Sequence, residues 1–268
     1  MKAKTSTAER VRAELESLAT SDAEAIARKE RFFKAVPGGY GEGDRFLAVS
    51  VPEQRRVAKA YWREASLSDV EVLLDCAFHE VRAVGLFIMV RMFEAAEDGS
   101  AERGASGRET AASEAAEDGG AGDGGLRAGI FTAYTHYIDR VNNWDLVDSS
   151  APHILGAYLY ERPAERGLLY EWSHSGHLWR QRAAVVATFT FIRRGRFDET
   201  IALAEILLSH EHDLIHKAVG WMLREIGNRA PEVEYAFLDD YAAVMPRTML
   251  RYAVEKVPEA RRRYYMSL

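Results

Sequence analysis

The chain has 268 residues, of which 47% are hydrophobic, and a formal net charge of −6. It is long enough to bury a full core as one elongated repeat domain or as two compact ones. No apolar run approaches the roughly 20 residues of a membrane span, and the N-terminal segment lacks the apolar stretch of a signal peptide, so we expect a cytoplasmic protein with no membrane partner. The single cysteine, Cys76, excludes disulfides within the chain and thiolate zinc clusters. We expect neither a metal nor a cofactor.

Helical periodicity dominates the chain, because apolar residues recur at spacings of three and four over several long segments. The predicted helices cover residues 10–19, 80–93, 182–192, 199–208 and 216–226. Short segments of turn-forming composition separate them and are expected to be breaks, at 36–44, 149–153, 193–198, 227–232 and 256–259. No segment has a convincing strand pattern, so the sequence predicts an all-α fold.

Residues 97–124 differ in composition from the rest of the chain. They contain eight acidic and two basic residues and no large apolar side chain, so this segment alone accounts for the net charge of −6. Such a segment buries too little apolar surface to offset the entropy lost on ordering. We therefore predict a disordered acidic insertion within a single repeat domain that spans 1–268. A solvated linker is the simpler interpretation of its role, and acidic mimicry of DNA is the alternative.

Four predicted helical segments resemble one another, and each has a cationic residue with small apolar residues after it: Arg82, Arg182, Lys217 and Arg251. The spacing is 35 residues from Arg182 to Lys217 and 34 from Lys217 to Arg251. It is 100 from Arg82 to Arg182, or 72 without the 28-residue insertion, which is two units of 36. Such a period, with two helices per unit, is typical of a helical solenoid. We expect a curved array whose concave face carries these cations as a ridge.

Positive charge is concentrated in the second half of the chain. Residues 172–197 contain five arginines and no acidic residue, and further cations follow toward the C-terminus. This asymmetry is typical of a surface that binds phosphates. The alternative is that the cations occupy ordinary helix-start positions, with their aliphatic stems lying over the core.

Trp144 and Asp148 are four residues apart, so on a helix they would share one face. An indole and a carboxylate can together serve a cationic group. Trp144, Arg182 and Trp221 are spaced by 38 and 39 residues, close to the repeat length, and are expected along one wall of a groove that binds nucleic acid. The alternative is a ladder of core tryptophans, with Asp148 as a helix cap near the break at 149–153.

Four ordered motifs give the chain a family resemblance: YGEGDRFLAVSVPEQRR from Tyr40, NNWDLVDSSAP from Asn142, LWRQRAAV from Leu178 and HKAVGWMLREIG from His216. The chain resembles the AlkD-type DNA alkylation repair glycosylases over most of its length, from about Phe33 to Tyr265, apart from the insertion. This resemblance implies a right-handed α-solenoid of HEAT-like repeats with a concave DNA-binding face.

The resemblance also implies a catalytic site of Asp148, Trp144 and Trp221. Together with the cation series, the expected DNA-binding residues are Arg182, Tyr40, Lys217, Arg224, Arg193, Arg194 and Arg251. The implied reaction is excision of cationic bases such as N7-methylguanine and N3-methyladenine without base flipping. Such a base departs neutral and needs no general acid, so Asp148 would stabilise the cationic sugar and orient water while the indoles hold the deoxyribose. No lysine lies in the motif beside Asp148, so we expect simple hydrolysis.

Two other function classes stay open on the sequence. One is a non-catalytic module that binds damaged or branched DNA, or a protein partner, through the same face. The other is a protein scaffold, which would not require the acid-free cationic stretch at 172–197. For the enzyme, we expect a monomer whose partner is double-stranded DNA with alkylated bases.

Overall fold

The computed structural model describes residues 5–105 and 123–268, with side chains described in 5–96 and 125–268. Regular structure in these ranges is helical, and the only β-type pairing among them is an isolated bridge between Arg45 and Phe78. The predicted all-α helical-repeat fold is therefore confirmed. The chain divides into two compact units, 1–146 and 147–268, which we describe separately. The concave face stays a prediction.

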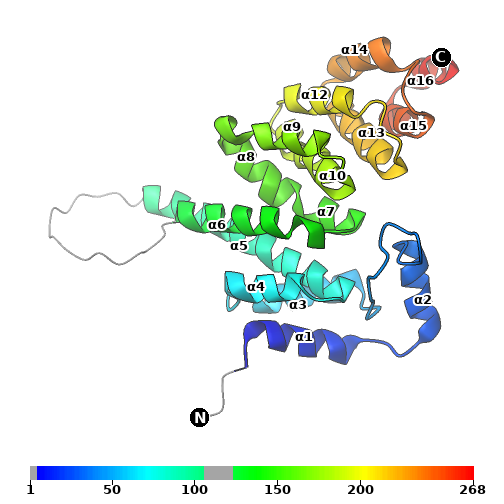
Figure 1. Cartoon of the computed structure of the whole chain (residues 1–268). Helices are drawn as coiled ribbons and strands as arrows, with labels where there is room; N and C mark the ends of the chain where they lie inside the picture. The colour runs from blue at the N-terminus through cyan, green and yellow to red at the C-terminus, as the bar shows by residue number, and fades with distance from the viewer. Residues whose placement is uncertain (1–4, 106–122) are drawn as a thin grey trace, which may run out of the picture. The chain divides into compact units, whose positions relative to one another are not determined.

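The first unit packs around one long apolar helix. Helix α5 contacts α3, α4 and α6, and α1 packs against α3 and α4. The buried residues of α5 include Val84, Leu86 and Ile88. Serines cap three shorter helices in capping boxes, at Ser6, Ser50 and Ser66. The elements, shown in Figure 1, are α1 (Thr7–Leu18), α2 (Ala23–Phe32), α3 (Val51–Tyr61), α4 (Leu67–Leu74), α5 (His79–Ala105), α6 (Asp123–His136), η1 (Tyr137–Arg140) and the start of α7 (Trp144–Ser150).

Both ends of the predicted acidic insertion at 97–124 lie in helices. Helix α5 continues to Ala105, and α6 begins at Asp123. The disorder of the insertion stays a prediction. The rest of the predicted insertion, residues 106–122, lies outside the described residues.

The second unit stacks equivalent helices of the predicted repeat on one another. Helix α10 packs against α13, and α13 packs against α15, and these helices carry Arg182, Lys217 and Arg251 in turn. Helix α9 packs against α10 and also against α12. The predicted period of about 35 residues thus corresponds to the stacking step seen in Figure 1. The remaining elements are η2 (Pro152–Gly156), α8 (Ala157–Glu161), η3 (Pro163–Glu165), α9 (Gly167–His174), α10 (Leu178–Ala187), α11 (Phe189–Arg193), α12 (Asp198–Ile206), α13 (Asp213–Gly227), α14 (Pro231–Tyr241), α15 (Arg247–Ala253), η4 (Val254–Lys256) and α16 (Glu259–Ser267).

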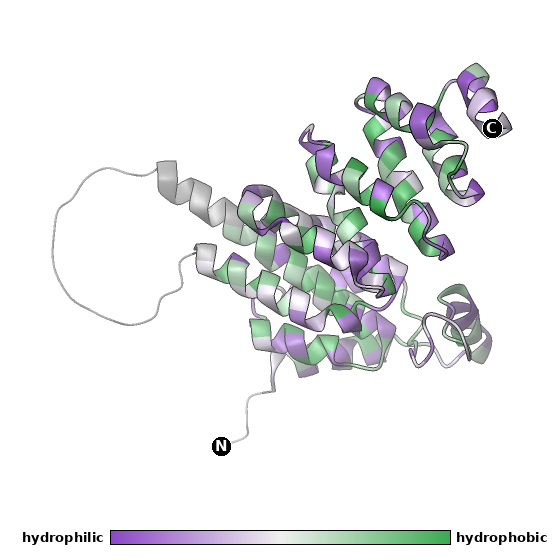
Figure 2. Cartoon of the chain, turned by 45° about the horizontal axis from the view of Figure 1, so that its top comes forward, coloured by the Kyte–Doolittle hydropathy of each residue, from purple (hydrophilic) through white to green (hydrophobic). Residues whose placement is uncertain are grey.

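Close approach between stacked helices depends on a glycine. A Cβ atom at Gly220 of α13 would lie 2.4 Å from the carbonyl oxygen of Met249 and 2.6 Å from Cβ of Tyr252. A side chain at this position would push α15 away. Figure 2 shows hydrophobic and hydrophilic residues on different sides of many helices, as expected for amphipathic helices that bury one stripe. No helix in the described ranges has the length and apolar character of a membrane span.

The predicted break at 149–153 is wrong, because the chain stays helical through it. After α7, residues 152–156 form a π-helical turn in which the Gly156 N–H donates to the Ala151 carbonyl at 2.8 Å. Pro152 has no N–H for the Asp148 carbonyl one turn earlier, and a π-turn absorbs that mismatch. The Thr190 hydroxyl donates to the Pro152 carbonyl at 2.6 Å. The turn after Asp148 is thereby fixed to α11.

Candidate functional site

In the second unit, Arg182 of α10 binds the carboxylate of Asp148 with two parallel hydrogen bonds. Nε donates to Oδ1 at 2.9 Å, and an Nη atom donates to Oδ2 at 2.7 Å. The second Nη atom donates to the Leu214 carbonyl at the start of α13. Arg182 is 4% exposed, whereas the side chain of Asp148 keeps 20% of its surface exposed. A buried guanidinium therefore holds a carboxylate that water still reaches.

This position differs from the exposed one expected for a residue that binds phosphate. The described hydrogen bonds of Arg182 go to Asp148 and Leu214. They orient Asp148 and tie α10 to α13. A contact between Arg182 and a DNA phosphate stays a prediction.

Trp221 of α13 is half-buried, unlike Trp172 and Trp179, which belong to the core. Its ring lies 5.8 Å from the ring of Phe189, which is also half-buried. The core-ladder interpretation thus fits Trp179 and not Trp221. The Trp221 indole N–H donates to Glu225 Oε1 at 3.3 Å.

Two guanidinium groups face the ring beside Trp221. Arg193 and Arg229 each lie 5.9 Å from the centroid of Phe189. We call Phe189, Trp221, Arg193 and Arg229 the aromatic–cationic patch. Phe189 and Arg229 were not among the predicted site residues. The signal for Phe189 was its position inside the acid-free stretch 172–197.

The other predicted cations of the second unit lie at or near the surface. Lys217 binds Asp213 one turn earlier at 2.7 Å, and Arg224 pairs with Glu255. Arg194 is exposed and lies 4.4 Å from the ring of Tyr160. Arg251 is exposed and donates to the Thr248 hydroxyl at 3.3 Å. These ion pairs and ring contacts leave their roles in DNA binding as predictions.

Arg82, the first member of the predicted cationic ridge, does not line a surface. It is 1% exposed, and one of its Nη atoms donates to Asp44 Oδ1 at 2.7 Å and to Asn142 Oδ1 at 3.0 Å. The prediction for Arg82 is wrong because Arg82 is buried and paired with Asp44. This partner is 38 residues away in sequence. Sequence spacing gives no sign of such a pair.

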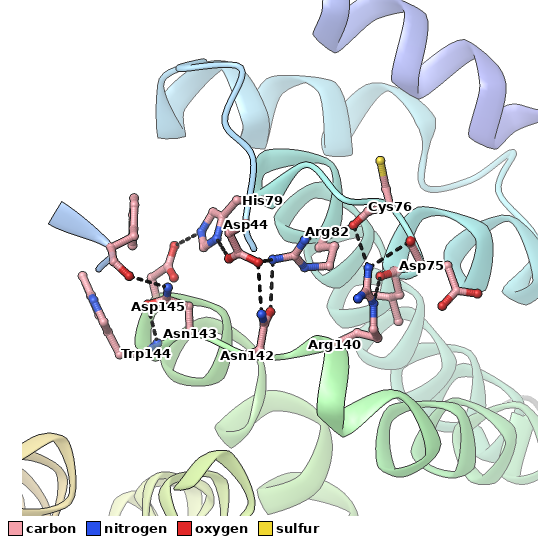
Figure 3. A network of polar contacts seen from close by, with 12 residues as sticks. Asp44, Asp75, Cys76, His79, Arg82, Arg140, Asn142, Asn143, Trp144 and Asp145 are labelled. Carbon is pink, nitrogen blue, oxygen red and sulfur yellow. Dashed lines mark hydrogen bonds and ion pairs between the residues drawn. The ribbon is translucent and has the colours of Figure 1, made fainter. Parts of the chain in front are cut away.

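The same carboxylate begins a polar network in the first unit that sequence analysis missed (Figure 3). Asp44 accepts from Arg82, from Asn142 Nδ2 at 3.0 Å, and from His79 Nδ1 at 3.2 Å. On the other side of the imidazole, His79 Nε2 donates to Asp145 Oδ2 at 2.9 Å. The sequence signal was His79 itself, directly before the predicted helix 80–93 and three residues before Arg82. We call Asp44, His79, Arg82, Asn142 and Asp145 the polar network.

The polar network keeps His79 charged. Burial alone would lower the pKa of His79, but the hydrogen bonds that His79 donates to Asp145 and Asp44 outweigh it and raise the pKa to about 9. For Asp44, burial would raise the pKa, but the hydrogen bond to His79 and the charge of Arg82 hold it below its usual range. At neutral pH, a cation therefore lies between two carboxylates.

The network and its neighbours fix the start of α7. Asn143 Oδ1 accepts from the Trp144 N–H at 2.9 Å, and Asn143 Nδ2 donates to the Phe33 carbonyl at 3.1 Å. The ring of Trp144 stacks on Phe33 with centroids 5.9 Å apart and meets Phe32 edge-on at 5.7 Å. Trp144 is half-buried. The hydrogen bond to its backbone N–H and the packing of its indole on Phe32 and Phe33 therefore fix the position of Trp144.

Phe32 is a further aromatic residue that sequence analysis missed. It ends α2 and is 60% exposed, although its ring contacts Trp144. Tyr40, the predicted tyrosine, is half-buried in the turn segment 36–44, and its contact with DNA stays a prediction.

The described side chains contain no group of three or more His, Cys, Asp or Glu that could hold a metal ion.

Comparisons with known proteins identify a family and a similar fold. The family model for DNA alkylation repair enzymes matches residues 11–257. Among solved structures, a predicted DNA alkylation repair enzyme from Enterococcus faecalis is similar, with 15% sequence identity and a TM-score of 0.64, over 90% of this chain and 98% of that one. At this identity the likeness concerns the fold. No curated protein matches the sequence. Because the family model covers nearly the whole chain, the protein belongs to the DNA alkylation repair enzyme family and has a role in DNA repair.

Proposed function

We propose that this protein is a monofunctional DNA glycosylase that hydrolyses the N-glycosidic bond of cationic alkylated purines. The observation that carries the proposal is the Asp148 carboxylate, held by two hydrogen bonds from buried Arg182 and still partly exposed. A fixed negative charge of this kind suits a reaction whose cost is the formation of a sugar cation. N7-methylguanine and N3-methyladenine are the bases of the proposed class.

The electron balance of the reaction explains why one carboxylate is enough. The bond from C1′ to the ring nitrogen breaks, and its electron pair neutralises the positive charge of the alkylated base. The deoxyribose is left as an oxocarbenium ion. Water then bonds to C1′ and gives up a proton, so the products are a free neutral base and an abasic site. Asp148 stabilises the sugar cation, orients the water and accepts its proton.

Arg182 acts on the reaction through Asp148. With both carboxylate oxygens bound to one guanidinium, Asp148 cannot rotate to follow a mobile partner, and its charge is in place before the sugar cation forms. The exposed fraction of Asp148 provides access for water. In this proposal, Arg182 is a positioning residue and reaches a phosphate only through the small exposed part of its side chain.

Two half-buried tryptophans complete the proposed catalytic set. Trp144 precedes Asp148 by one turn in α7, and Trp221 lies in the aromatic–cationic patch. An indole face stabilises a nearby cation and excludes water from it. We assign both indoles to the deoxyribose, in keeping with a lesion that stays stacked in the duplex instead of being flipped out.

The surface cations supply the proposed DNA-backbone contacts. Arg193 belongs to the aromatic–cationic patch, and phosphate contacts of this kind position a protein on a duplex without reading its sequence. The proposed set is Arg193, Arg194, Lys217, Arg224 and Arg251, with Tyr40 from the first unit. Ion pairs of Lys217 and Arg224 with acidic neighbours exchange for phosphates at small cost, since exposed pairs contribute about 0–1 kcal/mol.

Product analysis tests the proposal. A duplex with one N7-methylguanine is incubated with the protein, and free base and abasic DNA are measured by mass spectrometry. We expect both products in equal amounts. Borohydride should trap no covalent complex, because no lysine takes part. A trapped adduct would contradict simple hydrolysis, and a duplex that stays intact after incubation with the folded protein would contradict the glycosylase activity.

The second candidate is a non-catalytic module that binds damaged DNA. The aromatic–cationic patch also fits this function, because rings and guanidinium groups bind nucleic acid without chemistry. Binding that weakens steeply with salt, together with an intact lesion, would favour this candidate.

A further inference from the structure

Two separate routes join His79 to Trp144 within the first unit. The polar route is the hydrogen bond from His79 Nε2 to Asp145, the residue after Trp144, at 2.9 Å. The stacked route runs through Phe33, whose ring lies 4.5 Å from the His79 ring and 5.9 Å from the Trp144 ring. A change at His79 therefore reaches the Trp144 indole in two ways: through the hydrogen bond to Asp145, the next residue in the chain, and through the packing of the Phe33 ring.

The other side of the imidazole is anchored. His79 Nδ1 donates to Asp44 Oδ2 at 3.2 Å, and Asp44 Oδ1 is held by Arg82 and Asn142 (Figure 3). Asp44 is the last residue of the turn segment 36–44. His79 thus bridges this segment and the first turn of α7.

Both ring nitrogens of His79 face carboxylate oxygens, which only accept hydrogen bonds. A neutral imidazole has one donor and one acceptor, so one carboxylate would then face a lone pair. The bridge is complete only in the doubly protonated imidazolium. The charged groups around the ring are Asp44 and Asp145, which favour the imidazolium, and Arg82, which opposes it.

We propose that His79 is a positioning residue, whose imidazolium, held between Asp44 and Asp145, fixes the first turn of α7 and the ring of Trp144. Loss of the His79 proton breaks one of the two bridges and releases Trp144. The consequence for base excision rests on the proposed function, whereas the coupling between His79 and Trp144 does not. His79 is not among the predicted site residues.

Fluorine NMR tests the coupling without any substrate. The five tryptophans are labelled as 5-fluorotryptophan, the Trp144 resonance is assigned with Trp144→Phe, and the pH is raised from 7 to 10. We expect the Trp144 resonance to move with a midpoint near the His79 pKa of about 9, while the buried Trp172 and Trp179 stay constant. A Trp144 resonance that does not change with pH would overturn the proposal.

Two variants identify the titrating group. In Asp145→Asn, the carboxylate that favours the imidazolium is lost, so the midpoint at Trp144 should fall by about one pH unit or more. In His79→Gln, the titration at Trp144 should disappear. His136→Gln is the matched control, since His136 is an exposed histidine of the same unit. In this variant the Trp144 resonance should titrate as in the wild type. An unchanged midpoint in Asp145→Asn would contradict the bridge even if His79→Gln fails to fold.

Single-turnover base release at pH 7.5 tests the consequence. For His79→Gln we expect the rate constant to fall about 10- to 100-fold, with the dissociation constant for DNA unchanged, because a misplaced group costs rate more than binding. A merely structural role would lower the melting temperature and leave the rate of the folded protein unchanged. If the wild type releases no base, the proposed function fails, and the NMR titration still decides the coupling.

Discussion

The guanidinium of Arg182 grips both oxygens of the Asp148 carboxylate, at 2.9 and 2.7 Å, from a buried position on α10. These residues are 34 positions apart in sequence, about one repeat. The repeat period thus has a chemical consequence as well as a structural one, because the stacking of successive helical repeats brings the cation of one repeat onto the carboxylate of the repeat before it.

Arg182→Lys should impair catalysis more than DNA binding. Lysine keeps the charge but cannot make two parallel hydrogen bonds, so Asp148 becomes free to rotate. We expect single-turnover base release to fall at least about 10-fold and the free energy of unfolding to fall by about 1–3 kcal/mol. Kinetics and chemical denaturation measure the two effects, and Arg12→Lys, at an exposed position of α1 outside the proposed site, is the control. A full rate in folded Arg182→Lys would show that the two-point grip is unnecessary.

Arg193→Ala and Arg229→Ala should weaken DNA binding through the aromatic–cationic patch. Each guanidinium lies beside the Phe189 ring, next to Trp221. If each neutralises one phosphate, each substitution should lower the slope of log affinity against log salt by about 1. Fluorescence anisotropy at several salt concentrations measures the slope. Arg12→Ala, on α1 in the first unit, should leave it unchanged, and an equal loss there would mean that the patch has no special role.

Gly220→Ala should destabilise the second unit. Its new Cβ would lie 2.4 Å from the Met249 carbonyl oxygen, so α13 and α15 must separate. Overpacking of this kind costs about 1–3 kcal/mol. Gly167→Ala is the control, because a Cβ there meets no atom within 4 Å. Urea denaturation compares the two, and equal stabilities would contradict the close stacking of α13 on α15.

Glu234→Gln should stabilise the protein in alkaline solution. Burial raises the pKa of Glu234 to about 8, and Oε1 has no hydrogen-bond partner among the described residues. A carboxyl with a raised folded pKa contributes full stability below its unfolded pKa and loses it as pH rises toward the folded pKa. The variant should therefore gain over wild type between pH 5 and 8 and show no gain at pH 4. Thermal melts measure this, with exposed Glu232→Gln as control. A gain that does not depend on pH would refute the burial argument.

The helices were predictable from sequence wherever an amphipathic stripe decides the fold. The stacking of α10, α13 and α15 follows from the spacing of Arg182, Lys217 and Arg251, because each helix buries its stripe against the next. The helical path through 149–153 was not predictable. The break expected at Pro152 is replaced by a π-turn, and the Pro152 carbonyl accepts from Thr190, far along the chain.

The site was predictable in its residue types more than in their partners. Spacing and the family resemblance predict Trp144, Asp148 and Trp221 as site residues, and their roles stay predictions. The pairing of Arg182 with Asp148, which joins two successive repeats, was not predicted. The polar network was missed for the same reason, because Asp44, His79 and Asp145 are far apart in sequence. Arg82 is buried because Asp44 pairs with its charge. The sequence does not show this tertiary contact, so it predicted a surface position for Arg82.

The most direct test of the catalytic assignment is the single-turnover rate of base release by Asp148→Asn on a duplex with one N7-methylguanine. The variant keeps the shape of the side chain and removes its charge, so we expect a fall of at least about 100-fold with DNA affinity close to wild type. The melting temperature should fall but the protein should stay folded, because buried Arg182 loses its charged partner. Asp240→Asn, at an exposed position of the same unit, should react like wild type. If folded Asp148→Asn released the base as fast as wild type, Asp148 would not be the catalytic carboxylate.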